Sequence, residues 1–251
     1  MHKIKELIYY KAFSGYENVV AFTSTKQTFD TNNPRFTGDS PEIYIQNRIL
    51  LAEKLMIKPD QLVFPRQTHT NCIAEIDEIP KTEIKETDAL VTNKTGICLC
   101  VQTADCVPIL LFDPVNGVIA AIHAGWRGTV KKIAEIAVSK MVVQYNSLPE
   151  NIIAAIGPSI SPEIYEVGDE VVAAVRDSIP NSELILHRKS GGKFHVNLWE
   201  ANRQILLSNG LSEKNIEILG ECSYIQNNKY FSARKNGLET GRMVSGIMLL
   251  R

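Results

Sequence analysis

Short apolar runs of strand length alternate along this chain with a few longer segments of helical periodicity, and this alternation limits the fold more than any other feature. Several runs follow one another directly. The clearest pair is 107–112 and 118–123, joined by the turn sequence Asp-Pro-Val-Asn-Gly at 113–117, which predicts a hairpin. Adjacent strands mixed with about four helices predict an α/β or α+β fold, with mixed β-sheets flanked by helices.

The other expected elements are assigned in the same way. Further strands are expected at 7–13, 19–23, 62–64, 72–76, 89–92, 97–103, 152–156, 216–219, 230–233 and 243–250. Helices are expected from the Ser40 cap to about 56, from after Gly128 to about 145, at 168–178, and after Asn197, with Glu200 as its capping-box partner and Gly210 past the end. No linker-like stretch of Pro, Gly and Ser divides the chain, so residues 1–251 are expected to form one domain.

Composition excludes several classes of protein. The chain is 44% hydrophobic and 22% charged, which is typical of globular proteins rather than disordered or fibrous ones. The net charge of −1 argues against a broad surface for nucleic acid or anionic membrane. No signal-like apolar segment follows the first charged residues, and the longest apolar run is too short to span a bilayer.

The cysteines number five, at positions 72, 98, 100, 106 and 222. An odd number in a chain of this length, without an export signal, favours reduced thiols in a cytoplasmic protein. Several common motifs are absent. The sequence has no G-x-G-x-x-G, P-loop, H-E-x-x-H or G-x-S-x-G pattern, and no H-x-E with P-C-x-x-C. Any hydrolase or deaminase chemistry must therefore use another arrangement.

Three residues remain that can carry chemistry together: His69, Cys106 and His123. Each stands at the end of an expected strand or in a turn, where side chains of a sheet converge on one rim. Two imidazoles and one thiolate make a three-ligand zinc site with a fourth position for water or substrate. Asp105, beside the thiol, is a candidate to orient a ligand or relay a proton. The alternative, a buried thiol and two hydrogen-bonded histidines, stays open on spacing alone.

Four arginines are candidates for binding an anionic substrate. Arg127 lies between Gly125 and Gly128 at an expected helix start, where free N–H groups and the helix dipole favour an anion. Arg66 precedes His69 by three residues, and two more arginines, Arg234 and Arg242, flank a loop near the C-terminus. Solvated loop charges are the alternative explanation.

At these residues the chain resembles a known family. The resemblance lies in Thr103-Ala104-Asp105-Cys106-Val107-Pro108, the His-Ala-Gly-Trp-Arg-Gly segment at 123–128, Gly-Pro-Ser-Ile at 157–160 with Tyr-Glu-Val at 165–167, and the closing Phe231-Ser232 to Thr240-Gly241-Arg242-Met243. These segments are similar to those of the YfiH family, which was once labelled multicopper polyphenol oxidase and is also called peptidoglycan editing factor. Many relatives have an aromatic residue where Ala233 stands, and often Gln-Val-His-Gly where this chain has Gln67-Thr68-His69-Thr70, which bears on substrate preference rather than on metal binding.

The resemblance implies a single α/β domain with a metal, usually zinc, held by His69, Cys106 and His123. It also implies phosphorolysis of adenosine, inosine and methylthioadenosine, together with deamination of adenosine. The expected partners are purine nucleosides and phosphate, without nucleic acid or membrane, for a monomer or small homo-oligomer. For deamination, zinc would direct water at C6 of the purine. For phosphorolysis, Arg127 and its helix start are the first candidates to hold phosphate.

Three other readings stay open at this stage. Copper suits two His and one Cys, but a multicopper oxidase needs more histidines than the remaining His2, His187 and His195 supply. A metal-free thiol hydrolase acting on cell-wall precursors or amides would use Cys106 as nucleophile and a histidine as base. A non-catalytic metal-binding partner protein is the third.

Overall fold

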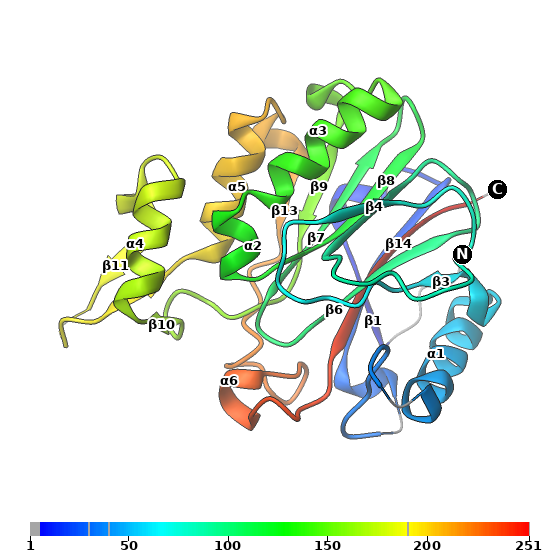
Figure 1. The fold of residues 1–251 in the computed structure, drawn as a ribbon, viewed down its shortest axis with the longest axis horizontal. Coiled ribbons are helices and arrows are strands. Elements are labelled where there is room, and N and C mark those ends of the chain that lie inside the picture. The colour runs from blue at the N-terminus through cyan, green and yellow to red at the C-terminus, as the bar shows by residue number, and fades with distance from the viewer. Residues whose placement is uncertain (1–5, 30, 40, 190, 251) are drawn as a thin grey trace.

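Two β-sheets packed face to face form the centre of the protein (Figure 1). The structure, a computed structural model, describes residues 6–29, 31–39, 41–189 and 191–250, without the side chain of residue 43. The first sheet has the strand order β1 (Leu7–Tyr9), β2 (Val19–Ser24), β14 (Met243–Leu249), β6 (Cys98–Thr103) and β3 (Leu62–Val63). The second has the order β13 (Ile216–Ile218), β9 (Ile153–Ile156), β7 (Val107–Asp113), β8 (Val118–Ala124), β5 (Ala89–Thr92) and β4 (Ile73–Glu75).

Both sheets are mixed. The first has one parallel pair, β3 with β6, at one edge, and the second has a parallel pair at each edge, whereas the centres of both are antiparallel. The hairpin β7–β8 lies in the middle of the second sheet. Ile109 and Leu111 face the helices, whereas Leu110 and Phe112 face the first sheet. Burial on both faces explains why this strand reads as one continuous apolar run. The predicted mixed-sheet α/β class is confirmed.

Helices cover the outer face of each sheet, which gives the layer order helix, sheet, sheet, helix. Helix α1 (Pro41–Leu55) packs Leu51, Ala52 and Leu55 on the first sheet. The second sheet is covered by α3 (Ile133–Tyr145) and α5 (Leu198–Ser208), with α2 (Trp126–Val130) beside them (Figure 1).

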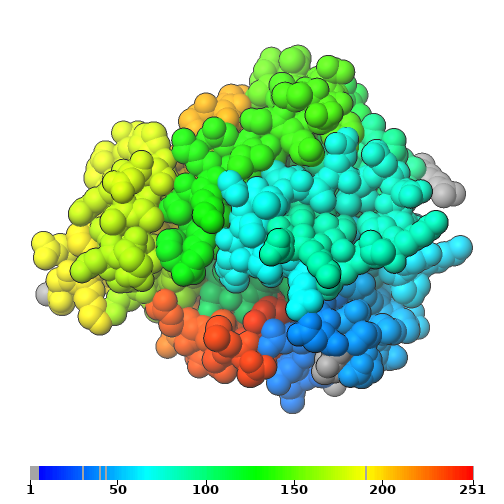
Figure 2. Space-filling view, in the orientation of Figure 1, coloured from blue at the N-terminus to red at the C-terminus, as the bar shows by residue number. Residues whose placement is uncertain are grey.

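A smaller unit projects from one side of these layers. Helix α4 (Asp169–Ser178) lies there with a three-stranded sheet of order β10 (Glu166–Val167), β12 (Phe194–Val196) and β11 (Leu186–Arg188). It forms the yellow bulge of the surface in Figure 2. Its strands have only two or three residues, which is too short for a recognisable pattern, and so the sequence did not predict them.

Short turns complete the chain. Helix α6 (Ala233–Asn236) is a single turn near the C-terminus. The 3-10 turns within the described residues are Lys11–Phe13, Lys26–Thr28, Pro59–Gln61, Pro149–Asn151, Ser182–Leu184 and Glu213–Asn215. Among the described residues, no helix has the length and apolar character needed to cross a membrane.

Several expected elements differ in detail. The helix predicted from after Gly128 to 145 begins earlier, at Trp126, and is two helices, because Lys132 takes a left-handed conformation (φ 58°) between them. The strand predicted at 230–233 is wrong: Tyr230 and Phe231 are buried, and then the Ser232 hydroxyl accepts a hydrogen bond from the Lys235 N–H and caps α6. A run of buried aromatic residues reads as a strand whether or not its backbone pairs.

The structure can also be compared with the predicted end of the first strand and with two predicted helix caps. The strand expected at 7–13 stops at Tyr9 and gives way to a 3-10 turn. The Asn197 cap is confirmed, since its side chain accepts a hydrogen bond from the Glu200 N–H at 3.1 Å. The reciprocal half of that capping box is wrong, because the Asn197 N–H donates to the Ile185 carbonyl. The Ser40 cap lies outside the described residues.

Candidate active site

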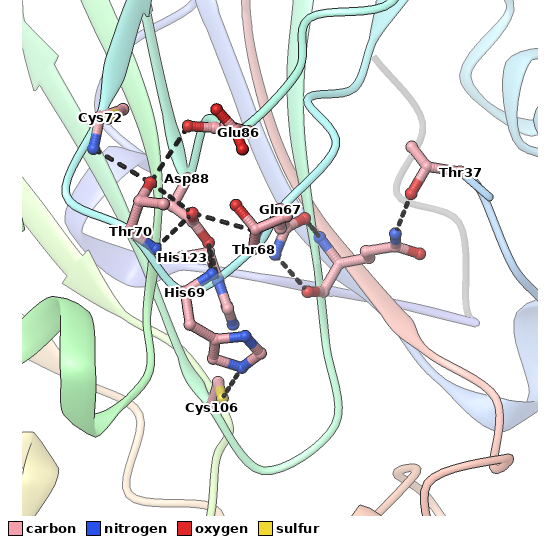
Figure 3. A network of polar contacts seen from close by, with 11 residues as sticks. Thr37, Gln67, Thr68, His69, Thr70, Cys72, Glu86, Asp88, Cys106 and His123 are labelled. Carbon is pink, nitrogen blue, oxygen red and sulfur yellow. Dashed lines mark hydrogen bonds and ion pairs between the residues drawn. The ribbon is translucent and has the colours of Figure 1, made fainter.

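His69, Cys106 and His123 come together at one end of the two sheets, as the sequence predicts (Figure 3). The segment from β3 to β4 crosses from the first sheet to the second and carries His69. The turn from β6 to β7 makes the same crossing and carries Cys106, while His123 stands near the end of β8. Two crossovers and a strand end therefore meet at one edge.

The three ligand atoms all lie within 4.8 Å of one another. His69 Nε2 is 3.9 Å from Cys106 Sγ, and the two imidazole rings are edge to face with centroids 4.9 Å apart. Two imidazole nitrogens and one sulfur are a donor set that zinc takes in proteins. Donor atoms at these separations need to move only slightly to bind one ion together. The residues present fit a metal. Within the described chain, no other group of three His, Cys or acidic side chains has this arrangement.

The fully buried Asp88 organises two of these residues (Figure 3). Its Oδ1 lies 2.7 Å from His123 Nδ1, which leaves Nε2 of that ring as the ligand atom. The same carboxylate accepts hydrogen bonds from the backbone N–H groups of Thr68, His69 and Thr70 and from the Thr70 hydroxyl. Burial alone would raise the pKa of Asp88, but His123 and Thr70 lower it to about 2.

The turn that carries His69 is strained. His69 has a φ of 62°, in the left-handed region that non-glycine residues seldom adopt. Three consecutive N–H groups converge on Asp88 in this turn. Charge-assisted hydrogen bonds of this kind offset the backbone strain and hold an exposed histidine in place.

Cys106 and His123 form a charged pair. Burial would raise the pKa of the Cys106 thiol, but His123 and His69 lower it to about 6. Burial would also lower the pKa of His123, but Cys106 and Asp88 raise it to about 9. At neutral pH the sulfur is therefore a thiolate, the form that binds metals and acts as a nucleophile.

Gly125 allows the thiol and the imidazole to approach the backbone. A Cβ atom at this position would stand 3.0 Å from Cys106 Sγ and 3.2 Å from His69 Cδ2. The glycine after the His-Ala pair is thus explained by close packing against two ligand side chains rather than by an unusual φ.

A pocket of about 450 Å³ opens over the three ligand residues. Its polar wall includes Gln67 and Gln102, which hydrogen-bond each other through backbone and side chain and tie the His69 loop to β6. The remaining lining residues come from several separate segments of the chain: Arg35, Thr103, Ala104, Asp105, Ile160, Tyr165, Ala233, Arg234, Leu238 and Arg242.

Arginines make this pocket cationic. Arg35 and Arg242 both donate to the Leu238 carbonyl, at 2.9 and 3.0 Å, so two like charges converge on one loop. Burial, with the charge of Arg35, lowers the pKa of Arg242 to about 10. Arg234 bonds the Glu166 carbonyl and lies over the Tyr165 ring. Such a group of cations is suited to a bound anion.

The other two predicted arginines lie outside the pocket lining. Arg66 pairs with Asp39 at 2.6 Å and with Glu83 at 3.4 Å. The exposed Arg127 lies over the Trp126 ring at 4.3 Å, and its helix α2 has only five residues. The helix start expected to hold phosphate is therefore a short turn.

Asp105 lines the pocket, but its carboxylate is hydrogen-bonded to the loops around it. One oxygen accepts from the Ser223 hydroxyl and the other from the Arg234 N–H, each at 2.6 Å. Its φ of 84° makes the sharp turn that presents Cys106. Both oxygens are occupied, and no hydrogen bond joins this carboxylate to the three ligand residues.

The sequence did not indicate Asp88, Arg35 or Tyr165. Asp88 directly precedes β5, whose pairing with β8 sets Ala89 opposite Ile122 and so brings the carboxylate beside His123. The spacing of residues along the sequence does not reveal that strand pairing. Arg35 lies in an irregular loop and Tyr165 precedes a two-residue strand, so neither has a periodic signal.

Known proteins resemble the chain over nearly its whole length. A family model described as multi-copper polyphenol oxidoreductase laccase matches residues 22–250. A protein of Bacteroides thetaiotaomicron named purine nucleoside phosphorylase is 37% identical, over 98% of this chain and 97% of its own. A protein of an unknown prokaryotic organism, named adenosine deaminase RL5, is 38% identical over 98% of this chain and 99% of its own.

The fold has matches among solved structures as well. The crystal structure of YlmD from Geobacillus stearothermophilus superposes with a TM-score of 0.90 at 29% identity, over all of this chain and 98% of the other. A crystal structure of the Bacillus licheniformis protein YfiH gives the same TM-score and identity, over 98% of this chain and 97% of the other.

Replacing Gly125 by alanine is expected to displace the Cys106 and His69 side chains and to weaken the binding of an added divalent metal by about tenfold to a hundredfold. The control is Gly15→Ala, where a Cβ meets nothing within 4 Å. Competition with a chromophoric chelator measures both affinities. Equal affinities in the two variants would contradict the packing argument.

Alkylation of Cys106 in the metal-free protein is expected to increase with pH, with a midpoint near 6, since the thiolate forms above the pKa. Peptide mass spectrometry after a short iodoacetamide pulse measures the modification of this residue. In His123→Ala the midpoint should move upward, because the positive charge beside the sulfur is lost. A wild-type midpoint above 8 would exclude the charged pair.

Proposed function

This chain belongs to the YfiH family, whose model is described as multi-copper polyphenol oxidoreductase laccase, and we propose that it is a purine nucleoside phosphorylase with adenosine deaminase activity. The observation that carries the proposal is the convergence of His69, Cys106 and His123 below a pocket that also holds arginines. The names of the two full-length relatives support the same pair of reactions.

Phosphorolysis needs phosphate and a nucleoside in one pocket. We assign phosphate binding to Arg242, Arg234 and Arg35, which line the pocket and bond only backbone carbonyls, apart from the 3.6 Å pair of Arg35 with the exposed Glu239. Phosphate supplies the counter-charge that carbonyls do not. Adenosine, inosine and methylthioadenosine would give the free base and ribose 1-phosphate or its methylthio analogue.

Deamination of adenosine replaces the amino group at C6 with oxygen from water. The residues His69, Cys106 and His123 would hold zinc, with copper as the other metal that this donor set accepts. When bound, zinc would lower the pKa of water toward 7. Asp88 fixes the His123 tautomer and the His69 turn, and the thiolate needs no deprotonation before it binds metal.

Polyphenol oxidation is not the activity we propose. A three-copper cluster requires several more imidazoles. Beyond the pocket, His187 and His195 face each other across β11 and β12, where His195 Nδ1 lies 2.9 Å from the Pro162 carbonyl. We also propose a cytoplasmic setting, supported by five cysteines that are all unpaired thiols.

One observation favours a second candidate. The thiolate of Cys106 beside an imidazolium is the arrangement of a cysteine hydrolase, as the sequence allows. A hydrolase of this kind would act on amides or cell-wall precursors without metal. Chelation separates the two, because it would abolish the nucleoside reactions and leave thiol hydrolysis intact.

The test is incubation of zinc-loaded protein with adenosine, with and without phosphate, followed by chromatography of the products. Adenine is expected only with phosphate, and inosine in either condition. Cys106→Ala should lower both rates by about 100-fold or more, since the sulfur is a ligand. The exposed Cys72→Ala is the matched control and should keep full activity. Neither product from folded, metal-loaded protein would refute the proposal.

A pair of arginine variants tests the phosphate site. Arg242→Gln is expected to raise the KM for phosphate by about tenfold to a hundredfold, because a charged donor is removed from the pocket. Arg66→Gln breaks only surface ion pairs and should leave this KM unchanged. Initial rates over a phosphate series measure both values, and the reverse ranking would place phosphate elsewhere.

A further inference from the structure

Tyr165 is held rigidly at the edge of the pocket. Its N–H donates to the Ser161 carbonyl at 2.9 Å, and its carbonyl accepts from the Val196 N–H at 3.1 Å. The Arg234 guanidinium lies 5.3 Å from the ring centroid and is itself fixed on the Glu166 carbonyl. The half-buried side chain lines the same pocket as the three ligand residues.

The hydroxyl of Tyr165 is a donor without an acceptor. Among the described residues, no group makes a hydrogen bond with it, although most polar side chains of the pocket are engaged. Burial raises the pKa of Tyr165 above its ordinary value, with a contribution from the nearby Cys106, so the hydroxyl keeps its proton at neutral pH.

The proposed phosphorolysis needs such a donor. When the bond between C1′ and N9 breaks, its electron pair moves into the purine, which leaves more readily when a ring nitrogen receives a proton. The arginines are matched to phosphate, whose negative charge holds their protons in place. Asp105 accepts hydrogen bonds at both oxygens, from the Ser223 hydroxyl and the Arg234 backbone N–H, so its carboxylate is engaged with the loops around it.

The other side chains of the pocket are committed elsewhere. The Gln67 side chain bonds the backbone N–H and carbonyl of Gln102, and the Gln102 amide donates to the Thr37 hydroxyl. The Thr103 hydroxyl is buried away from the pocket surface. His69 and His123 belong to the proposed metal centre. Tyr165 is therefore the neutral O–H group that remains to meet the base.

We infer that the Tyr165 hydroxyl is the acid catalyst of the phosphorolysis, donating to N3 or N7 of the departing purine; this rests on the proposed function. A phosphate oxygen forms the bond to C1′ as the bond between C1′ and N9 breaks, and the base takes the proton of Tyr165. The tyrosine recovers a proton from the attacking hydrogen phosphate. The products are the neutral base and the dianionic sugar phosphate, so atoms and charge balance.

The experiment compares two substrates in Tyr165→Phe, which removes the hydroxyl and keeps the ring. With inosine, kcat is expected to fall by about 100-fold or more, as for loss of an acid catalyst. With 7-methylinosine the fall should be less than about threefold, because its base is already cationic and leaves without a proton. Tyr145→Phe, at the end of α3 and outside the pocket lining, removes a hydroxyl that donates to Glu75; it is the matched control and should leave both rates unchanged.

Zinc content, melting temperature and adenosine deamination show whether Tyr165→Phe is intact, since deamination at C6 leaves the bond between C1′ and N9 unbroken. Equal losses with both phosphorolysis substrates would mean that the hydroxyl only packs or orients the nucleoside, and would overturn the inference. No loss with either would overturn it too. A wild-type protein that releases no base from either substrate refutes the proposed function itself.

Discussion

A single buried carboxylate, Asp88, holds the candidate active site in place. Five hydrogen bonds reach it, four from the turn 68–70 and one from His123. A buried charge is stable only when its oxygens are satisfied, and here the groups that satisfy them belong to the residues that must be positioned. The same contacts therefore stabilise the carboxylate and fix the geometry of the proposed metal centre.

The packing of two sheets explains why the site lies where it does. The segments before Cys106 and around His69 leave the first sheet and enter the second at the same edge. Each turn has a residue with positive φ, Asp105 in one and His69 in the other. Strain of this kind persists only when surrounding contacts over-determine it, and Asp88, Ser223 and the Arg234 N–H provide those contacts.

The pocket combines two opposite electrostatic demands. Near the ligand residues a thiolate and a carboxylate surround His123 and raise its pKa. Elsewhere in the pocket lining, Arg35 and Arg242 both donate to the Leu238 carbonyl, so two positive charges lie close together. A nucleoside and phosphate suit this division, because the neutral base can lie against the apolar and aromatic wall while the anion meets the arginines. Tyr165 lies along this wall, beside Arg234.

The sequence by itself determined the mixed-sheet class and singled out the three residues that converge as a candidate metal site, because apolar periodicity and the chemistry of scarce thiols and imidazoles are local properties. It also indicated two of the arginines that line the pocket, Arg234 and Arg242. Only the tertiary structure decided that Asp88, Arg35 and Tyr165 join them and that Arg66 and Arg127 do not. Those positions follow from strand pairing and from the meeting of loops distant in sequence, and no spacing along the chain encodes either.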